Sequence, residues 1–167
     1  MNSPRPLDAT KILECFNRHG VRYVVIGAFA AIVAGAPIAP SEDIDFTPEA
    51  TSENLDRLSA ALRELSARIR TDVEPAGLPF SHDGTSLGRA SVWNLTCDAG
   101  DFDLAFRPSG FDGGYKSHVT TSHVVVIDGI DAVIADLGDV IASKQAAGRP
   151  KDIATLPTLE RFAREGR

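Results

Sequence analysis

The sequence has 167 residues, of which 43% are hydrophobic and 24% charged, and a formal net charge of −6 at pH 7. These values are ordinary for a single globular domain over residues 1–167, and they argue against a general polyanion-binding protein. There is no apolar run of membrane-spanning length, so we expect no membrane span. Residues 1–8 lack the apolar stretch of a signal peptide, so we expect no signal peptide. With only two cysteines, Cys15 and Cys97, we expect no disulfide framework and a reducing cytoplasm.

Positive charge is concentrated at the C-terminal end. From residue 144 onward there are six Lys/Arg and three acids, so this tail carries +3 and the rest of the chain −9. Such a tail could meet phosphates, or it could be the solvated surface of a helix. The sequence leaves both interpretations open.

Helices and strands are predicted to alternate in the first half of the chain. Apolar residues recur at helical spacing over residues 8–19, with Asp8 as a possible cap and Gly20 as a stop. A buried strand, a short helix, a short strand and the clearest amphipathic helix follow, over residues 21–26, 28–34, 43–46 and 51–66.

Hairpins and two closing helices are predicted in the second half. Residues 71–89 are rich in Gly and Pro and predict little regular structure. Asp128-Gly129 is a strong two-residue hairpin signal. The predicted elements are two strand pairs and two helices, over residues 90–97 with 101–106, 122–127 with 130–134, 136–147 and 151–164.

Asp43-Ile44-Asp45 is the first candidate functional site. In a strand, residues i and i+2 share a face and lie about 6–7 Å apart, so the two carboxylates converge while Ile44 points into a core. Converging carboxylates repel each other by several kcal/mol at about 4 Å and an effective dielectric near 20. A divalent cation removes that repulsion, and Mg²⁺ is usually held by carboxylates and substrate phosphates. The alternative is a pair of acids on a surface strand.

Asp103 is a candidate for a third acid in the same cluster. Phe102, Leu104 and Phe106 form an apolar strand face, and Asp103 lies on the opposite one. It completes the cluster if its strand lies beside residues 43–46. Otherwise it faces solvent on an open sheet, which is how we interpret Asp101, as a turn residue.

Phosphate binding is indicated at Lys144 and at the turn around Gly27. Lys144 projects from the apolar stripe of its helix. A lysine there either has an anionic partner, which could be a triphosphate or the acid cluster, or extends its side chain to the edge of the stripe. A strand ends at Gly27 and a helix begins at Ala28, so free backbone N–H groups favour an anion there. Ser41 could donate a hydrogen bond to a phosphate oxygen.

Other chemistry-bearing residues are interpreted as structural. Trp93 is expected in the core rather than as a platform for stacking bases. Four histidines without ligand spacing are expected at the surface or in turns: His19, His82, His118 and His123. Three arginines on or just after the amphipathic helix are expected on a solvated face, with RNA contact as the alternative: Arg63, Arg68 and Arg70.

Four segments occur in a distinctive order: VVIGAFAAIVAG from Val24, SEDIDF from Ser41, FDL from Phe102 and KQAAGRPKD from Lys144. Together they resemble the minimal nucleotidyltransferases of the AbiEii/MenT toxin group, over about residues 10–160. The resemblance implies an α+β, DNA polymerase β-like nucleotidyltransferase fold, a mixed twisted sheet with helices packed around it. It also implies that the closing helices, residues 136–164, complete the site.

Specific residue roles follow from this resemblance. It implies a Mg²⁺ site formed by Asp43, Asp45 and Asp103, with Asp103 as the candidate base for an attacking hydroxyl. Lys144 would neutralise the triphosphate of an NTP. The implied nucleotide-binding residues come from the strand–helix turn, the loop before the acids and the last two helices: Gly27, Ala28, Ser41, Lys144, Lys151 and Asp152.

The reaction implied is transfer of a nucleotide to an RNA end, typically the tRNA 3′ end, by a toxin that a partner antitoxin restrains. In some relatives the antitoxin phosphorylates the hydroxyl residue at the Ser41 position. This chain departs from the family pattern at Ala28, where Gly or Ser is usual, and at Ala39, where arginine is common. Two alternatives stay open: nucleotide transfer to a small molecule or protein, and a non-catalytic domain that binds nucleotide or a partner.

Overall fold

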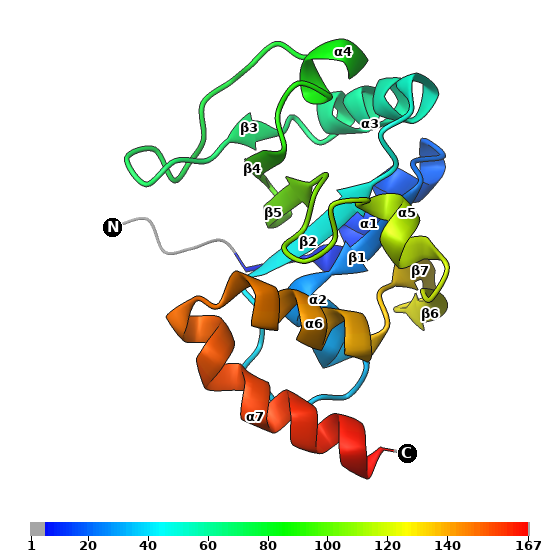
Figure 1. Cartoon of the computed structure of the whole chain (residues 1–167). Coiled ribbons are helices and arrows are strands. Elements are labelled where there is room, and N and C mark those ends of the chain that lie inside the picture. Colours follow the sequence, from blue (N-terminus) through cyan, green and yellow to red (C-terminus); the bar gives the residue numbers. More distant parts are fainter. Residues whose placement is uncertain (1–5, 167) are drawn as a thin grey trace.

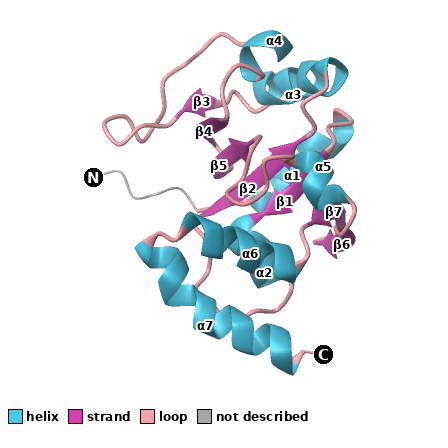
Figure 2. Cartoon of the chain, in the orientation of Figure 1, coloured by secondary structure: helices cyan, strands magenta, loops and turns pink. Residues whose placement is uncertain are grey.

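A mixed β-sheet forms the centre of the molecule. The computed structural model describes residues 6–166. Residues 1–5 and Arg167 lie outside it, and the expected absence of a signal peptide rests largely on the first of these segments. Seven strands are described: β1 (Tyr23–Ile26), β2 (Asp43–Pro48), β3 (Arg68–Ile69), β4 (Val92–Cys97), β5 (Gly100–Ala105), β6 (His123–Ile127) and β7 (Ile130–Ile134). Their order is β3-β4-β5-β2-β1-β7-β6 (Figure 2). The predicted α+β fold class is confirmed.

Helices pack around this sheet. They are α1 (Ala9–Arg18), α2 (Gly27–Val33), α3 (Ser52–Glu64), α4 (Gly84–Leu87), α5 (Tyr115–Val119), α6 (Leu137–Ala147) and α7 (Pro150–Glu165). In Figure 1, α3 and α4 lie at the top of the view and α2, α6 and α7 at the bottom, with the central strands between them. No helix among the described residues is long and apolar enough to cross a membrane.

The longer predicted elements are present, with ends that differ by a few residues. Asp8 caps α1, and the Asp128-Gly129 turn joins β6 to β7 with both residues at positive φ, as the hairpin signal predicts. Three elements were not predicted: β3, α4 and α5. These have two to five residues, too few for a hydrophobic period to appear.

The two central strands place apolar and acidic side chains on opposite faces. β2 and β5 are parallel neighbours, with Ile44 opposite Phe102 and Asp45 opposite Asp103. The apolar residues of this register are fully buried. Since side chains alternate along a strand, the acids emerge on the other side, which we call the acid face.

An aromatic cluster fixes α1 beneath these strands. The ring centroid of Phe16 lies 4.7 Å from that of Phe46, 6.0 Å from that of Tyr23 and 6.2 Å from that of Phe102. Phe16, Phe46 and Phe102 are fully buried. Edge-to-face and offset ring contacts of this kind stabilise a core beyond the area they bury.

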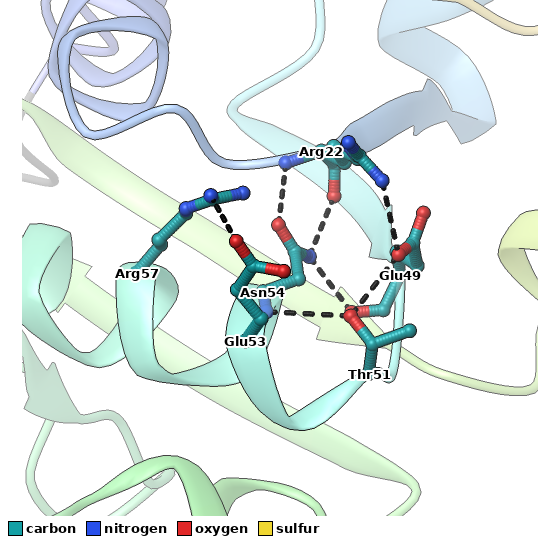
Figure 3. Close-up of polar contacts among 6 residues, drawn as sticks. All are labelled: Arg22, Glu49, Thr51, Glu53, Asn54 and Arg57. Carbon is teal, nitrogen blue, oxygen red and sulfur yellow. Dashed lines mark hydrogen bonds and ion pairs between the residues drawn. The ribbon is translucent and has the colours of Figure 1, made fainter.

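A buried amide joins the start of β1 to the start of α3 (Figure 3). Asn54 accepts from the Arg22 N–H at 2.7 Å and donates to the Arg22 carbonyl at 3.0 Å and the Glu49 carbonyl at 2.7 Å. Thr51 caps the helix by accepting from the Asn54 N–H at 3.3 Å. These bonds satisfy backbone groups where β2 ends, so the strand carrying two of the acids is anchored at its far end.

The first prediction concerns the aromatic cluster. Phe16→Ala should lower the free energy of unfolding by about 3–5 kcal/mol, because it leaves a cavity between α1 and the central strands. Val73→Ala is the control, since Val73 is 87% exposed and its truncation should change the free energy by less than about 0.5 kcal/mol. Urea unfolding followed by circular dichroism measures both. Equal midpoints would contradict the assigned core.

Candidate active site

Three acids gather on the acid face. Asp45 pairs in register with Asp103, and Asp43 lies two residues before Asp45 on the same side of β2. One carboxylate oxygen from each acid lies within 4.8 Å of the others. The condition that the sequence left open, that the strand of Asp103 lies beside residues 43–46, is therefore met.

The electrostatics of the cluster suit a divalent cation. Burial, followed by repulsion from Asp43 and Asp103, raises the pKa of Asp45 well above its ordinary value. Its Oδ1 atom is buried and has no hydrogen-bond partner among the described residues. A buried carboxylate oxygen without a donor, facing two further carboxylates, is unfavourable unless a cation or a proton is bound there.

Asp103 has a cationic partner that sequence reasoning assigned elsewhere. Arg70, expected on a solvated face, donates from Nη2 to Asp103 Oδ1 at 2.9 Å. Burial raises the pKa of Asp103, and the Arg70 charge opposes that rise. Asp101, interpreted as a turn residue, instead lies within β5, and its carboxylate is 3.7 Å from Arg70 Nη1. No sequence pattern indicated this pairing, because Arg70 follows a two-residue edge strand.

A cleft of about 560 Å³ opens over the acids. Its lining comes from strands β1, β2, β4 and β5, from the loop before β2, and from helices α2, α6 and α7. Every residue that sequence reasoning placed in the site lines it: Gly27, Ala28, Ser41, Asp43, Asp45, Asp103, Lys144, Lys151 and Asp152. The structure thus brings these residues together around one cleft.

Gly27 allows the strand–helix turn to approach the acids closely. It has a φ of +72°, and a Cβ atom there would lie 2.6 Å from Asp45 Oδ2. Any side chain would therefore collide with the carboxylate as well as adopt an unfavourable backbone conformation. α2 begins at Gly27 itself rather than at Ala28 as predicted.

The Ser41 hydroxyl is engaged within the chain. It donates to the Asp43 carbonyl at 2.6 Å and lies 3.3 Å from Asp43 Oδ1. This bond orders the loop immediately before the first acid. In the described conformation the hydroxyl therefore supports Asp43 rather than pointing freely into the cleft.

Asp152 organises the cations of the last two helices. Its side chain is fully buried and accepts from Lys144 Nζ at 3.4 Å and from Arg149 Nε at 2.7 Å. Burial acts to raise the pKa of Asp152, but these two cations outweigh it and the pKa is lowered. The anionic partner that the position of Lys144 required is thus Asp152. Arg149, which sequence reasoning missed, also lines the cleft.

The opposite side of the cleft carries two polar residues that sequence reasoning also missed. Asn94 on β4 lies in register with Asp103, and Arg107 follows β5. Both are exposed and line the cleft, and neither side chain has a hydrogen-bond or ion-pair partner among residues 6–166. Strand pairing could not be read from the sequence, so neither residue stood out.

A second cluster, outside the cleft, has a different character. Cys15, His19 and Glu64 lie close together, but Arg18 contacts both carboxylate oxygens of Glu64, at 2.9 and 2.7 Å. Burial, then the hydrogen bond to Glu64, raises the pKa of Cys15 to about 12. A protonated thiol beside an already paired carboxylate is a structural contact rather than a metal site.

The structure also corrects one of the histidine predictions. His118, expected at the surface or in a turn, is buried on α5, where its ring packs 4.2 Å from that of Phe111. The other three histidines are partly or fully exposed. Trp93 packs against the core as expected, and its indole N–H donates to the Leu87 carbonyl at 2.9 Å.

Comparison with known proteins identifies the fold. No protein-family model and no curated protein matches the sequence. Among solved structures, the chain is similar to the lincosamide antibiotic adenylyltransferase LnuA, with a TM-score of 0.60, 13% identity and coverage of 93% of this chain and 98% of LnuA. It is also similar to the antibiotic-resistance factor ANT(2'')-Ia, with a TM-score of 0.56, 14% identity and coverage of 90% and 79%.

A third similar structure comes from Thermotoga maritima, a protein provisionally described as a nucleotidyltransferase. The TM-score is 0.53, with 17% identity and coverage of 93% of this chain and 90% of that protein. The chain has the nucleotidyltransferase fold. At this identity the likeness establishes the architecture, so what the cleft does must be argued from its own residues.

The second prediction uses one substitution at two acids of this nucleotidyltransferase fold. Asp45→Asn should raise the free energy of unfolding at pH 7 in EDTA by about 1–2 kcal/mol, because it removes repulsion between carboxylates. The repulsion between two charges about 4 Å apart is roughly 4 kcal/mol at an effective dielectric of 20, and we expect part of it to be recovered. Asp152→Asn should lower it by about 1–3 kcal/mol, because charge-assisted hydrogen bonds to two cations are weakened.

The pH dependence follows from the directions of the two pKa shifts. The pKa of Asp45 is raised in the folded state, so its ionisation costs stability. The advantage of Asp45→Asn should begin to decline as the pH falls through that raised pKa and should be lost below the unfolded-state pKa. The pKa of Asp152 is lowered, so its stabilisation is present above the unfolded-state pKa and lost below the folded one. Urea titrations from pH 3 to pH 8 measure both, and shifts of the same sign would contradict the assignment.

Proposed function

We propose that this protein is a metal-dependent nucleotidyltransferase that moves a nucleotide from an NTP to an acceptor hydroxyl. The observation that carries the proposal is the convergence of three carboxylates and several cations in one cleft of a nucleotidyltransferase fold. Nucleotidyl transfer needs anions to hold the metal and cations to neutralise a triphosphate, and both are present.

Asp43, Asp45 and Asp103 are the residues that would hold Mg²⁺. The unpartnered Oδ1 of Asp45 and the mutual repulsion of the three acids fit such an ion. When bound, Mg²⁺ would neutralise these acids and polarise both the substrate phosphate and the acceptor hydroxyl.

The chain's own residues then act on the triphosphate. The acceptor oxygen forms a bond to the α-phosphorus, the bond from that phosphorus to pyrophosphate breaks, and Asp103 takes the hydroxyl proton. Lys144 and Arg149, held by Asp152, offset the negative charge of the departing pyrophosphate. Lys151, whose charge already acts on Asp45, lies on the same wall of the cleft.

The charges of the cleft favour an anionic acceptor. Apart from the three metal-binding candidates, the acid that lines it is Asp152, which is buried and paired with cations. Arg107 is exposed beside β5 without a partner among the described residues. One solved structure of ANT(2'')-Ia contains adenylyl-2''-tobramycin, the product of a polycationic acceptor. The unpaired charge of Arg107 on the wall of the cleft would repel such a molecule and attract a phosphate-bearing one.

These charges support RNA as the acceptor. The order of the four sequence motifs supports the narrower proposal that the acceptor is a tRNA 3′ end and that the protein is the toxin of a toxin–antitoxin pair. In that role Arg107 would meet the sugar–phosphate backbone, while Asn94, in register with Asp103, would contact the attacking ribose.

The third prediction tests transfer directly. Incubation with each α-labelled NTP, Mg²⁺ and total RNA should label an RNA of tRNA size. Asp43→Ala should reduce the labelling by at least about 10³-fold, since one member of the metal cluster is lost. Asp131→Ala, which removes an exposed aspartate on β7, separated from β2 by β1 and absent from the lining of the cleft, should label like the wild type. Persistent labelling by a folded Asp43→Ala variant would defeat the proposal.

The same assay distinguishes the alternatives. Replacing RNA by tobramycin or lincomycin should give no labelled product. Labelled antibiotic without labelled RNA would favour a small-molecule transferase. Mg²⁺-dependent NTP binding with no transfer to any acceptor would favour a non-catalytic domain.

The fourth prediction concerns the toxin role. Expression of the wild-type chain should arrest bacterial growth, and the Asp43→Ala substitution should relieve the arrest. Co-expression of a neighbouring antitoxin gene with the wild-type chain should also relieve it, with no substitution in the chain. Colony counts after induction measure this. Growth unaffected by the active wild-type enzyme would remove the toxin proposal and leave nucleotidyl transfer intact.

A further inference from the structure

One row of residues crosses four neighbouring strand positions on the acid face. The Arg70 N–H donates to the Asn94 carbonyl at 2.9 Å, so the chain just after β3 continues the ladder. Asn94 pairs in register with Asp103, and Asp103 pairs with Asp45. Backbone pairing therefore aligns an arginine at the edge of the sheet with two acids at its centre.

The Arg70 side chain is held at two points. Nη1 donates to the Leu95 carbonyl at 2.7 Å, and Nη2 donates to Asp103 Oδ1 at 2.9 Å. Nη1 also lies 3.7 Å from Asp101 Oδ2. The side chains of Arg70 and Asp103 are each 21% exposed, so water competes little for these contacts. Because a guanidinium is planar, anchoring one nitrogen to the backbone fixes the direction in which the other points.

We propose that Arg70 is a positioning residue that holds the Asp103 carboxylate in place as the third ligand of the metal site. This inference rests on the proposed function, because it assigns a partner to one of the three acids. Repulsion from Asp43 and Asp45 tends to turn Asp103 away from the cluster. By holding Oδ1 from a guanidinium anchored on β4, Arg70 fixes the orientation of the Asp103 carboxylate, and its charge offsets part of that repulsion.

The opposite effect would arise if Arg70 acted as a competing cation. A competitor neutralises Asp103 in place of the metal, so its removal tightens metal binding. A positioning residue preorganises the ligand, so its removal weakens metal binding. Loss of the partner of a metal ligand typically costs 10–100-fold in metal affinity. The sign of the change in affinity therefore decides between the two roles.

The fifth prediction is a comparison of Mn²⁺ affinities measured by electron paramagnetic resonance on the full chain without nucleotide. Arg70→Gln should weaken Mn²⁺ binding about 10–100-fold. Arg70→Lys, which keeps the charge but lacks the planar fork, should recover only part of the loss. Arg68→Gln is the matched control, because Arg68 lies two residues before Arg70, on β3, and contacts the Ala76 carbonyl and Asp98 rather than the acid cluster. It should bind Mn²⁺ as the wild type does.

Folding and function are separated within the same experiment. Circular dichroism and thermal unfolding report whether each variant folds, and millimolar guanidinium added to Arg70→Ala should restore part of its affinity if the guanidinium acts locally. Unchanged or tighter binding by folded Arg70→Gln overturns the positioning role. Wild-type Mn²⁺ binding without transfer to any acceptor overturns the proposed function alone, whereas a wild-type chain that binds no Mn²⁺ overturns both.

Discussion

Repulsion among three carboxylates is the constraint around which the rest of the site is arranged. Parallel pairing of β2 with β5 places Asp45 directly opposite Asp103, with Asp43 on the same face. The fold can hold these like charges together because the same alternation that exposes them buries Phe46 and Phe102 on the reverse side. Burial of large aromatic side chains stabilises the strands by several kcal/mol, which offsets the electrostatic cost of the acid face.

Two of the acids that line the cleft have cationic partners, which approach them from different directions. Arg70 approaches Asp103 from the sheet edge, and Lys144 and Arg149 converge on Asp152 at the junction of α6 and α7. Asp152 therefore differs in kind from Asp45: the partners of Asp152 are present within the fold, whereas Asp45 has a buried oxygen without a partner among the described residues. That contrast separates an acid whose charge is satisfied within the fold from one that is available to a cation or a proton.

Similarity to LnuA and ANT(2'')-Ia at 13–14% identity shows how little sequence the architecture requires. Hydrophobic alternation in the central strands and amphipathic helices suffice to specify the sheet, and many different residues satisfy that pattern. The cleft is where such proteins can differ, because residues on its walls contribute little to the core. In this chain, exposed Arg107 and Asn94 give the wall of the cleft beside β4 and β5 its own chemistry.

The sequence by itself determined the features that depend on near neighbours along the chain. Strand alternation put Asp43 and Asp45 on one face, and the Asp128-Gly129 dipeptide specified a hairpin with both residues at positive φ. Only the tertiary structure decided which strands became neighbours, and hence that Arg70 reaches Asp103 and that Asp152 is buried between two cations. The physical reason is that strand order and register are set by packing between distant segments, and local periodicity carries no information about that packing.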